Sequence, residues 1–385
     1  MKKAWNLAVV AGEHSGDAHG GNLVSSFSRL VPGARWFGAG GPVMASAGVE
    51  LLVPMEKLAV VGIAEVLAHL GDLWRQMGLL KKALSERRPD ALVLVDFPDF
   101  NFRLARYARK LGIPVVYYIT PQVWAWRQGR TEFLKQNVDL ALVIFPFEEA
   151  FLRQRGVEAH FVGHPLVDTA RPASSLEGFL KRHGLAPASP RVALLPGSRP
   201  SEVKRNLPPM MGAARLLAER FPDLAILVPW AGGLPEQLRR PYLDLPVRWI
   251  EGEYMDVLGH AHAAAVASGT ATLEAALMGV PEVIVYRLKV VTHAIARRMV
   301  HLDDVGLPNV VLGRRALPEL IQNDFSAGKL ADELAEILGD AEGARRRSAG
   351  IAEEIRSRLG SGNASARAAR ELLDFLEGGC RTNQR

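Results

Sequence analysis

The chain has 385 residues, of which 48% are hydrophobic and 23% charged, with a formal net charge of +6 and a sequence pI of about 9.5. This composition excludes an intrinsically disordered chain, and the length suits about two domains. The basic balance favours anionic partners such as phosphorylated substrates or acidic lipid, although ordinary surface charge is an equal alternative. Nucleic acid is the weaker option, because the chain has no basic tail, zinc-knuckle spacing or aromatic RNA-binding pattern.

The cysteine content and the chain start indicate a cytoplasmic protein. Cys380 is the single cysteine, so an intrachain disulfide is excluded and a reducing compartment is expected. The first apolar run, Leu7–Ala11, is too short for a signal peptide, and no stretch reaches the roughly 18–20 apolar residues of a membrane span.

Short apolar runs alternate with amphipathic stretches along the chain, which predicts βαβ units and parallel sheets. The first series of candidate strands is Leu7–Ala11, Arg35–Ala39, Leu51–Pro54, Ala91–Val95, Val115–Ile119, Leu140–Ile144 and His160–Val162. The second series is Val192–Leu195, Ala225–Pro229, Val247–Ile250, Ala263–Ala267 and Val283–Tyr286.

Two such series predict an α/β protein of two Rossmann-like, doubly wound domains that face a cleft. We place the first at residues 1–168 and the second at 174–360, joined by a linker near Ala170–Ser175. A final helix at about 363–378 follows Ser361-Gly362-Asn363, and packing back onto the first domain is one option for it.

The first strand ends in a glycine-rich turn, Gly12 to Gly21, whose backbone can approach a ligand closely. It lacks the GxGxxG spacing and the ribose-binding acid of a dinucleotide site. We expect Glu13, Ser15 and Asp17 to bind sugar hydroxyls. For Ser15 or Asp17, capping the following helix is an equal alternative.

The segment from Lys57 to Leu84 is apolar at helical spacing, with basic residues nearby. We favour a helix of the core. The alternative is an exposed apolar face for a membrane or an acyl chain, formed by Val61, Ile63, Leu67 and Trp74.

The run Ala91–Val95 predicts a buried parallel strand, and it ends on Asp96, with Asp99 beyond Pro98. Ligands of open α/β sheets bind beyond the carboxyl ends of strands. A carboxylate there is partly desolvated yet reachable, which suits a general base. Asp96 is therefore our first candidate for the base; capping of the turn is the alternative.

The next predicted strand leads to Trp124, Trp126 and Arg127. Two indoles beside a guanidinium offer a platform for a sugar face, an acyl chain or an anion, unless the tryptophans belong to the core.

The second half repeats a strand–turn–helix pattern twice. Gly197, Ser198 and Arg199 offer amide and guanidinium donors for a diphosphate, without the lysine of an NTPase loop. The second copy places an acid one turn into a helix, suited to two ribose hydroxyls, with helix-dipole complementation as the alternative; its residues are Ser268, Gly269, Thr270 and Glu274. Asn309 adds an amide in a turn.

No metal site or nucleophilic serine is expected. The ten histidines contain no HExxH pair, a single cysteine excludes thiolate clusters, and no GxSxG motif is present.

A series of motifs then occurs in order along nearly the whole chain, with little beyond residue 325 or in the linker at 166–190. They are AGEHSGDAHGG, GGPVMASAG, MEKLAVVGIAEVL, VDFPDFN, ITPQVWAWRQGR, FPFEEAF, VGHPLVD, LLPGSRPSEV, ASGTATLEAAL and LPNVVLGR. Together they resemble the lipid-A-disaccharide synthase family.

The resemblance implies a GT-B type glycosyltransferase, without a cofactor, whose C-terminal domain holds the nucleotide. The implied reaction joins UDP-2,3-diacylglucosamine to 2,3-diacylglucosamine 1-phosphate, giving a β(1→6) disaccharide and UDP at the inner face of the cytoplasmic membrane. Asp96 matches the family's candidate base, with Asp99 and then Glu13 behind it. Arg199, Glu274 and Asn309 match the UDP-binding set.

Partners implied are the two lipid substrates and anionic lipids of the membrane surface, with a homodimer as one option. Rival functions are a UDP-N-acetylglucosamine 2-epimerase, another lipid glycosyltransferase, and a non-catalytic UDP-sugar sensor or membrane-surface scaffold. Consumption of UDP-sugar without an acceptor distinguishes the epimerase, and binding without turnover distinguishes the sensor.

Overall fold

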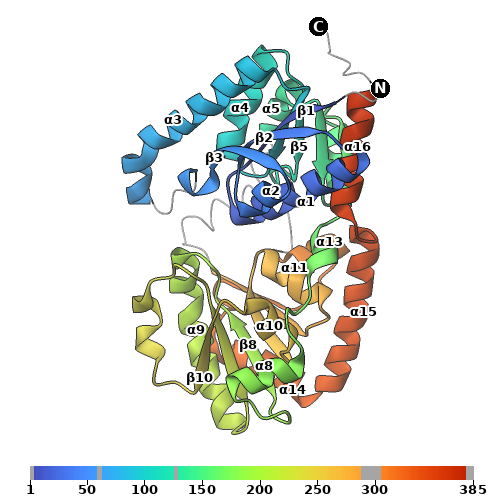
Figure 1. Cartoon of the computed structure of the whole chain (residues 1–385). Helices are drawn as coiled ribbons and strands as arrows, with labels where there is room; N and C mark the ends of the chain where they lie inside the picture. Colours follow the sequence, from blue (N-terminus) through green and yellow to red (C-terminus); the bar gives the residue numbers. More distant parts are fainter. Residues whose placement is uncertain (1–3, 59–62, 125–128, 288–304, 379–385) are drawn as a thin grey trace. The chain divides into compact units, whose positions relative to one another are not determined.

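The computed structural model describes residues 4–58, 63–124, 129–287 and 305–378, with the backbone alone for 63–70. Its chain forms two compact units (Figure 1). Unit 1 comprises Met1–Pro165 and Gly360–Arg385, and unit 2 comprises Leu166–Leu359. The chain therefore begins and ends in unit 1.

Unit 1 contains a seven-stranded parallel sheet in the order β3-β2-β1-β4-β5-β6-β7. The strands are β1 Asn6–Ala11, β2 Arg35–Gly40, β3 Val49–Pro54, β4 Ala91–Val95, β5 Val115–Tyr118, β6 Leu140–Val143 and β7 Ala159–Phe161. The helices are α1 His14–Leu30, α2 Pro42–Ser46, α3 Ile63–Arg87, α4 Pro98–Lys110, α5 Arg130–Asn137, α6 Pro146–Arg153 and α16 Ala364–Glu377, with a 3-10 turn at Met55–Lys57.

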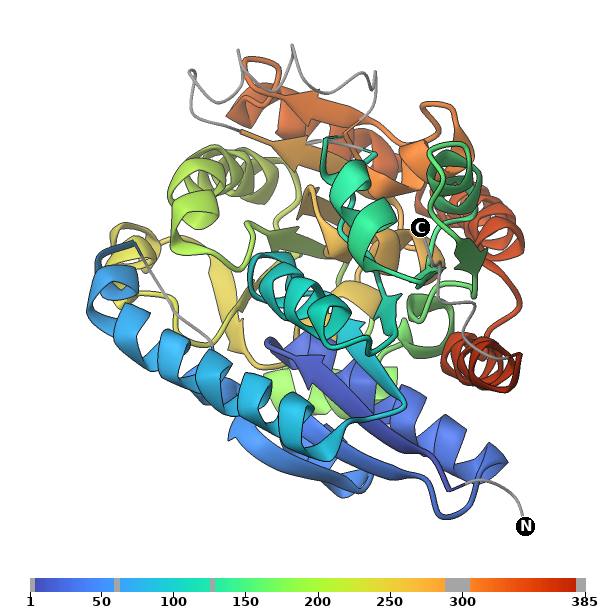
Figure 2. The ribbon, with the colours of Figure 1, turned by 90° about the horizontal axis from the view of Figure 1, so that it is seen from above.

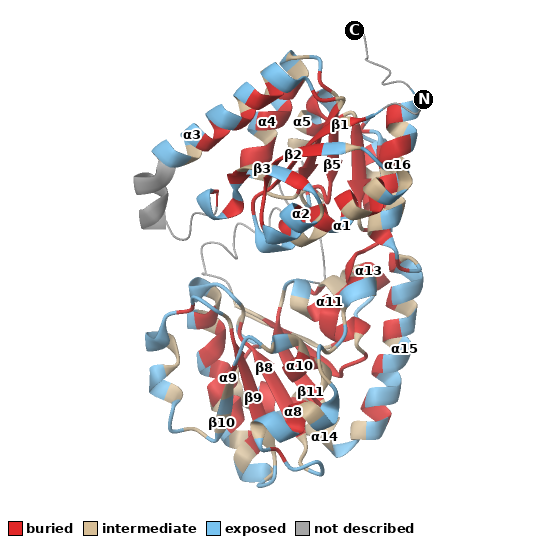
Figure 3. Cartoon of the chain, in the orientation of Figure 1, coloured by how far each residue is buried: buried red, intermediate tan, exposed pale blue. Residues whose placement is uncertain are grey.

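Both faces of this sheet are covered, which explains why its strands are continuous apolar runs. In β4, Leu92 and Leu94 pack in one core with α3 and α4, whereas Val93 packs in the other with α1 and α16. The central strands are accordingly buried throughout (Figure 3).

Unit 2 contains a six-stranded parallel sheet in the order β10-β9-β8-β11-β12-β13. The strands are β8 Arg191–Leu195, β9 Ala225–Trp230, β10 Val247–Glu251, β11 Ala263–Ala267, β12 Glu282–Tyr286 and β13 Glu319–Ile321. The helices are α7 Leu166–Thr169, α8 Leu176–His183, α9 Pro200–Arg220, α10 Tyr254–Gly259, α11 Thr270–Leu277, α13 Leu307–Leu312, α14 Ala327–Gly339 and α15 Ala341–Leu359, with 3-10 turns at Glu236–Leu238 and Arg240–Tyr242.

The two sheets confirm the prediction of two Rossmann-like, parallel α/β folds. Each sheet also has a point where the strand order reverses, between β1 and β4 in unit 1 and between β8 and β11 in unit 2. Loops that leave the carboxyl ends of such neighbouring strands diverge, and ligands of open α/β sheets bind there.

Helix α16 joins unit 1 from the far end of the sequence and packs beside α1 (Figure 1). Its apolar face lies in the core with α1 and is formed by Ala368, Ala369, Leu372, Leu373 and Leu376. Arg367 donates from Nε to the Val162 carbonyl (2.7 Å), and Glu371 lies 2.5 Å from Nδ1 of His160.

Helix α3 is the long blue helix of Figure 2, with 25 residues. Its second half is partly a core helix, because Met77, Leu80 and Leu84 are buried. Trp74 is 55% exposed, with the Arg103 guanidinium over its ring. Val61 lies outside the described residues, and the side chains of Ile63 and Leu67 are not described.

Candidate active site

In unit 1, the loops after β1 and β4 leave the sheet at its reversal point and carry Glu13 and Asp96. Glu13 is exposed and Asp96 is half-buried. Burial raises the pKa of Asp96, the negative charge of Glu13 raises it further, and the Phe97 N–H offsets part of the rise. Asp96 is therefore a carboxylate of increased basicity at the expected position for a ligand.

The backbone at Asp96 is strained. Asp96 has φ +45°, Phe97 has φ +52°, and Ile119 at the end of β5 has φ +60°. The Asp96 carbonyl accepts from the Tyr117 hydroxyl (2.8 Å) and the Asn101 side-chain amide (2.7 Å), which hold this conformation. Non-glycine residues held in left-handed backbone conformations cluster at functional sites.

Asp99 lies in a different environment. Its side chain is 81% exposed and forms an ion pair with Nη2 of Arg130 (2.8 Å). Water solvates this carboxylate and the Arg130 cation already pairs with it. The geometry thus favours Asp96 over Asp99.

Asp17, predicted to bind sugar hydroxyls, has its carboxylate engaged within unit 1. It is 2% exposed, and its carboxylate accepts from the backbone N–H groups of Gly41 (2.8 Å), Val43 (3.0 Å) and Met44 (3.0 Å). It therefore anchors the N-terminus of α2, where a negative charge is favourable. It does not cap α1, whose N-cap residue is Glu13; Ser15 is exposed on the first turn of α1.

Trp124 belongs to an aromatic cluster at the carboxyl side of β5 and β6. Its indole N–H donates to Oε1 of Glu148 (2.9 Å), and its ring packs edge-on against Phe147 with centroids 4.8 Å apart. Glu148 is buried, also accepts from the Phe145 N–H (3.0 Å), and has a pKa raised to about 7 by burial. Trp124 is thus fixed by a buried acid, while Trp126 and Arg127 lie outside the described residues.

In unit 2, the loop after β8 has the form of a diphosphate turn. Gly197 has φ +112°, and a Cβ there would lie 2.8 Å from the Glu202 carboxylate, so glycine is required. Ser198 is exposed. The Arg199 side chain is 78% exposed and 3.1 Å from Glu202, so its guanidinium is accessible to a ligand.

The loop after β11 begins α11. The Ser268 hydroxyl donates to the Val305 carbonyl (3.0 Å), whereas Gly269 and Thr270 are exposed. Glu274 is 6% exposed, burial raises its pKa, and it accepts at Oε1 from the Tyr254 hydroxyl (3.1 Å).

Tyr254 is a site residue that sequence reasoning missed. It is 44% exposed, and burial together with Glu274 raises the pKa of its phenol well above the usual range. In the sequence, Tyr254 is marked only as an aromatic residue that follows a predicted strand. Its contact with Glu274 joins residues 20 positions apart, so no local pattern predicts it.

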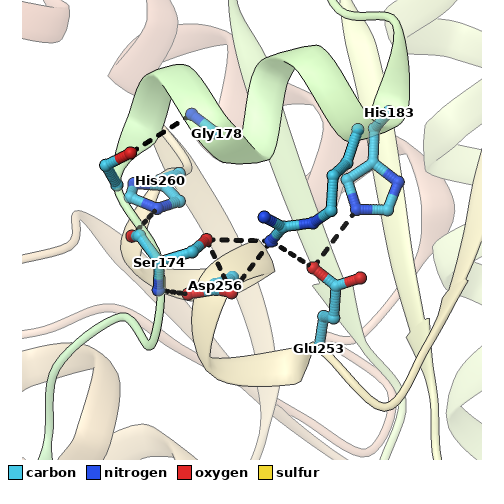
Figure 4. A network of polar contacts seen from close by, with 8 residues as sticks. Ser174, Gly178, His183, Glu253, Asp256 and His260 are labelled. Carbon is cyan, nitrogen blue, oxygen red and sulfur yellow. Dashed lines mark hydrogen bonds and ion pairs between the residues drawn. The ribbon is translucent and has the colours of Figure 1, made fainter.

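A polar network holds the start of α10, and so holds Tyr254 (Figure 4). The Asp256 carboxylate accepts from the backbone N–H and the hydroxyl of Ser174, each at 2.9 Å. Arg182 donates to the Ser174 hydroxyl (2.9 Å) and to Glu253 (2.7 Å). Ser174, just before α8, is thereby bonded to Asp256, and Arg182, within α8, is bonded to Glu253.

Asn309, predicted to bind the nucleotide, has a side chain that is engaged within its own loop. It is fully buried; its Nδ2 donates to the Leu317 carbonyl (2.9 Å) and to Glu319 (2.8 Å), and its Oδ1 accepts from the N–H groups of Ala316 and Leu317 (2.9 Å each). Its amide is saturated within its own loop, so its side chain organises that loop, and its contact with the nucleotide stays a prediction.

Within the described residues, no group of three or more His, Cys, Asp or Glu side chains is placed to hold a metal ion. None of the helices among those residues combines the length and apolarity needed to cross a bilayer.

Comparison with known proteins gives sequence relatives along nearly the full chain. Residues 7–371 match the family model described as lipid-A-disaccharide synthetase. The chain is 43% identical over 373 residues to the lipid-A-disaccharide synthase of Geobacter sulfurreducens, covering 96% of this chain and 97% of that one. It is 44% identical over 374 residues to that of Anaeromyxobacter dehalogenans, covering 96% and 97%.

Solved structures share the fold at low identity. UDP-GlcNAc 2-epimerase from Neisseria meningitidis, solved with UDP-GlcNAc, matches with a TM-score of 0.64 at 12% identity, covering 96% of this chain and 100% of that one. The calicheamicin glycosyltransferase CalG4 matches with a TM-score of 0.59 at 19% identity, covering 98% and 99%.

Proposed function

The chain belongs to the lipid-A-disaccharide synthase family, and from this premise we propose that Asp96 is the base of its transfer reaction. The enzyme is a hexosyltransferase that joins UDP-2,3-diacylglucosamine to 2,3-diacylglucosamine 1-phosphate and forms the lipid A disaccharide and UDP. The observation that carries the proposal is the half-buried carboxylate of raised pKa at the reversal point of the unit 1 sheet.

The chemistry is an inverting displacement at the anomeric carbon of the donor. The 6-hydroxyl of the acceptor attacks while Asp96 takes its proton, the new glycosidic bond forms, and the bond to UDP breaks. A base gains rate from a pKa near the working pH. The raised pKa of Asp96 therefore supports Asp96 as the base, whereas Asp99 is exposed and ion-paired. The negative charge of Glu13 contributes to the raised pKa of Asp96.

We assign the donor to the reversal point of unit 2. Arg199 and the amides around Gly197 and Ser198 would hold the diphosphate and stabilise its negative charge as UDP departs. The exposed start of α11 at Gly269 and Thr270, beside Ser268, supplies further donors. Glu274, fixed by Tyr254, would accept hydrogen bonds from the ribose hydroxyls.

On the acceptor side, Trp124 offers a partly exposed indole of fixed orientation for a sugar face or an acyl chain. Ser15, which is exposed, stays a proposed contact, and so do Asp17, Trp126 and Arg127. The exposed Trp74 and the first turns of α3, with Val61, Ile63 and Leu67, are our proposed membrane or acyl face at the inner surface of the cytoplasmic membrane. A homodimer stays a proposal.

Acceptor-dependent UDP release tests the proposed function. UDP-2,3-diacylglucosamine is incubated with the enzyme in EDTA, with and without 2,3-diacylglucosamine 1-phosphate. We expect release only with the acceptor, because the acceptor hydroxyl is the nucleophile. We expect it in EDTA, because Arg199 and the helix amides stabilise the charge of the leaving group. Release without acceptor would indicate hydrolysis or epimerase-like chemistry. UDP binding without release would indicate a different acceptor or a sensor.

A further inference from the structure

Unit 2 has a basic pocket at the amino end of its sheet, where β8 and β11 begin. A cavity of about 290 Å³ there is lined by four basic side chains, Arg191, His260, His262 and Arg345. An adjoining hollow of about 470 Å³ shares His262 and Arg345 and adds Arg346. The proposed UDP residues follow the opposite ends of the same strands, about 16 Å away along the five residues of β8.

Arg191 is a buried cation, 4% exposed. Its Nε donates to the His260 carbonyl (2.9 Å) and its Nη1 to the Ser189 carbonyl (2.9 Å), so the guanidinium is rigidly placed. Nη2 faces Nε2 of His262 at 3.4 Å. Among the described residues, no carboxylate is paired with this charge.

The tautomer of His262 follows from the hydrogen bond that its Nδ1 accepts. Nδ1 accepts the backbone N–H of Arg191 (3.0 Å), so Nδ1 carries no proton. Burial, with Arg191 and Arg345 close by, lowers the pKa of His262 and keeps the ring neutral. A neutral imidazole then holds its proton on Nε2. Two donors, the Nε2–H of His262 and the Nη2–H of Arg191, therefore lie next to each other. An acceptor beside them would satisfy both.

Arg345 and the first turn of α15 extend the positive potential. Burial lowers the pKa of Arg345, and within the described part of the chain it has no hydrogen-bond or ion-pair partner. Ala341, the first residue of the 19-residue helix α15, lines both cavities. The lining acid Glu342 is 94% exposed and lies 4.0 Å from Arg346, and Asp340, just before the helix, pairs with Arg347 (3.0 Å).

We propose that this pocket binds a phosphate group, with oxygens accepting from Arg191, His262 and Arg345. A tetrahedral oxyanion supplies the several acceptors that two guanidiniums and an imidazole N–H require, and charge-assisted bonds of this kind are the strong ones. The site is distinct from the diphosphate turn after β8 and does not depend on the proposed function. The phosphate can come from a free phosphomonoester or from a lipid headgroup.

The test is calorimetric titration of the full-length protein with inorganic phosphate at constant ionic strength, with saturating UDP to occupy the diphosphate turn. We expect Arg345→Gln to weaken phosphate binding by about tenfold or more, since charge-assisted hydrogen bonds are lost. Arg345→Lys should retain part of the affinity. Arg347→Gln removes the same charge from the same helix, but Arg347 lines neither cavity. This variant should therefore bind phosphate like the wild type.

A second arm identifies the source of the phosphate. Sedimentation with phosphatidylcholine vesicles, with and without phosphatidic acid, is compared for the wild type, Arg345→Gln and Arg347→Gln. Binding of free phosphate that Arg345→Gln abolishes supports a soluble ligand. Binding of phosphatidic acid alone, with the same sensitivity, supports a headgroup. Absence of binding in both arms, or equal binding by all variants, would overturn the proposal.

Discussion

Asp96, at the end of β4, has both a candidate catalytic carboxylate and a strained left-handed backbone conformation. The Asp96 carbonyl is held by Tyr117 and Asn101, so the carboxylate is presented from a backbone that cannot relax. The pre-organised placement of a base removes reorganisation from the reaction step.

Replacement of Asp96 by asparagine should therefore lower kcat by about 10²–10⁴, the usual contribution of general base catalysis. Asparagine keeps the shape, so folding and the Kd for UDP should be unchanged. The matched control is Asp99→Asn, which should lose far less. Near wild-type kcat for Asp96→Asn, with normal folding, would remove Asp96 from the reaction.

The charge of Glu13 should appear in the pH profile. The base acts when deprotonated, and its raised pKa moves the acidic limb of kcat/KM to higher pH than for an ordinary aspartate. Glu13→Gln removes a repelling charge, so it should lower the pKa of Asp96 and move that limb to lower pH. An unmoved limb would mean that another group limits the rate.

Tyr254 gives a prediction on the donor side. Tyr254→Phe removes the hydroxyl that orients Glu274, so UDP affinity should fall by about tenfold, the value of a hydrogen bond to a charged group. The loss should vanish with 2′,3′-dideoxy-UDP, because that ligand lacks the hydroxyls. Tyr242→Phe is the control. An equal loss for both ligands would assign Tyr254 to general packing.

At the scale of elements, α2 depends on one side chain from another helix. Asp17→Asn removes a carboxylate that accepts three backbone N–H groups, and should lower the free energy of unfolding by about 2–3 kcal/mol. Urea denaturation measures this, with exposed Ser15→Ala as a control expected to change it by less than about 0.5 kcal/mol. Unchanged stability with lost activity would indicate that Asp17 acts as a ligand of the sugar and does not anchor α2.

Elements buried on both sides were predictable, whereas three-residue β13 was missed. The strand β4 is apolar at every position because each face meets a core, and its bounds agree with the prediction. β13 is Glu-Leu-Ile, a strand only through its pairing with β12. Such a segment has no periodicity to detect.

The site residues divide in the same way. The positions of Asp96 and Glu274 were predictable because each lies at a fixed offset from a strand end, whereas their roles stay predictions. The structural contacts of Asp17 and Asn309, and the partners of Trp124 and Tyr254, involve residues 7 to 27 positions away in sequence. A single sequence does not encode those distances in any local pattern.

At the scale of the whole molecule, α16 is part of the core of unit 1. Leu372 is fully buried there, so Leu372→Ala should destabilise unit 1 by about 2–5 kcal/mol. In calorimetry we expect one transition to move and the transition of unit 2 to stay, with exposed Arg370→Ala as the control. A uniform shift of all unfolding would show that the two units unfold as one.

The return of the chain to unit 1 also has a consequence for synthesis on the ribosome. Residues 1–165 emerge first, yet the apolar side chains of α1 that share a core with α16 stay uncovered until residues 364–377 have been translated and released. Unit 2, a continuous segment, can complete its core while the nascent unit 1 still exposes apolar surface. The unit whose synthesis starts first is thus the last to complete its hydrophobic core. We expect chaperones to retain truncated translation products that lack α16.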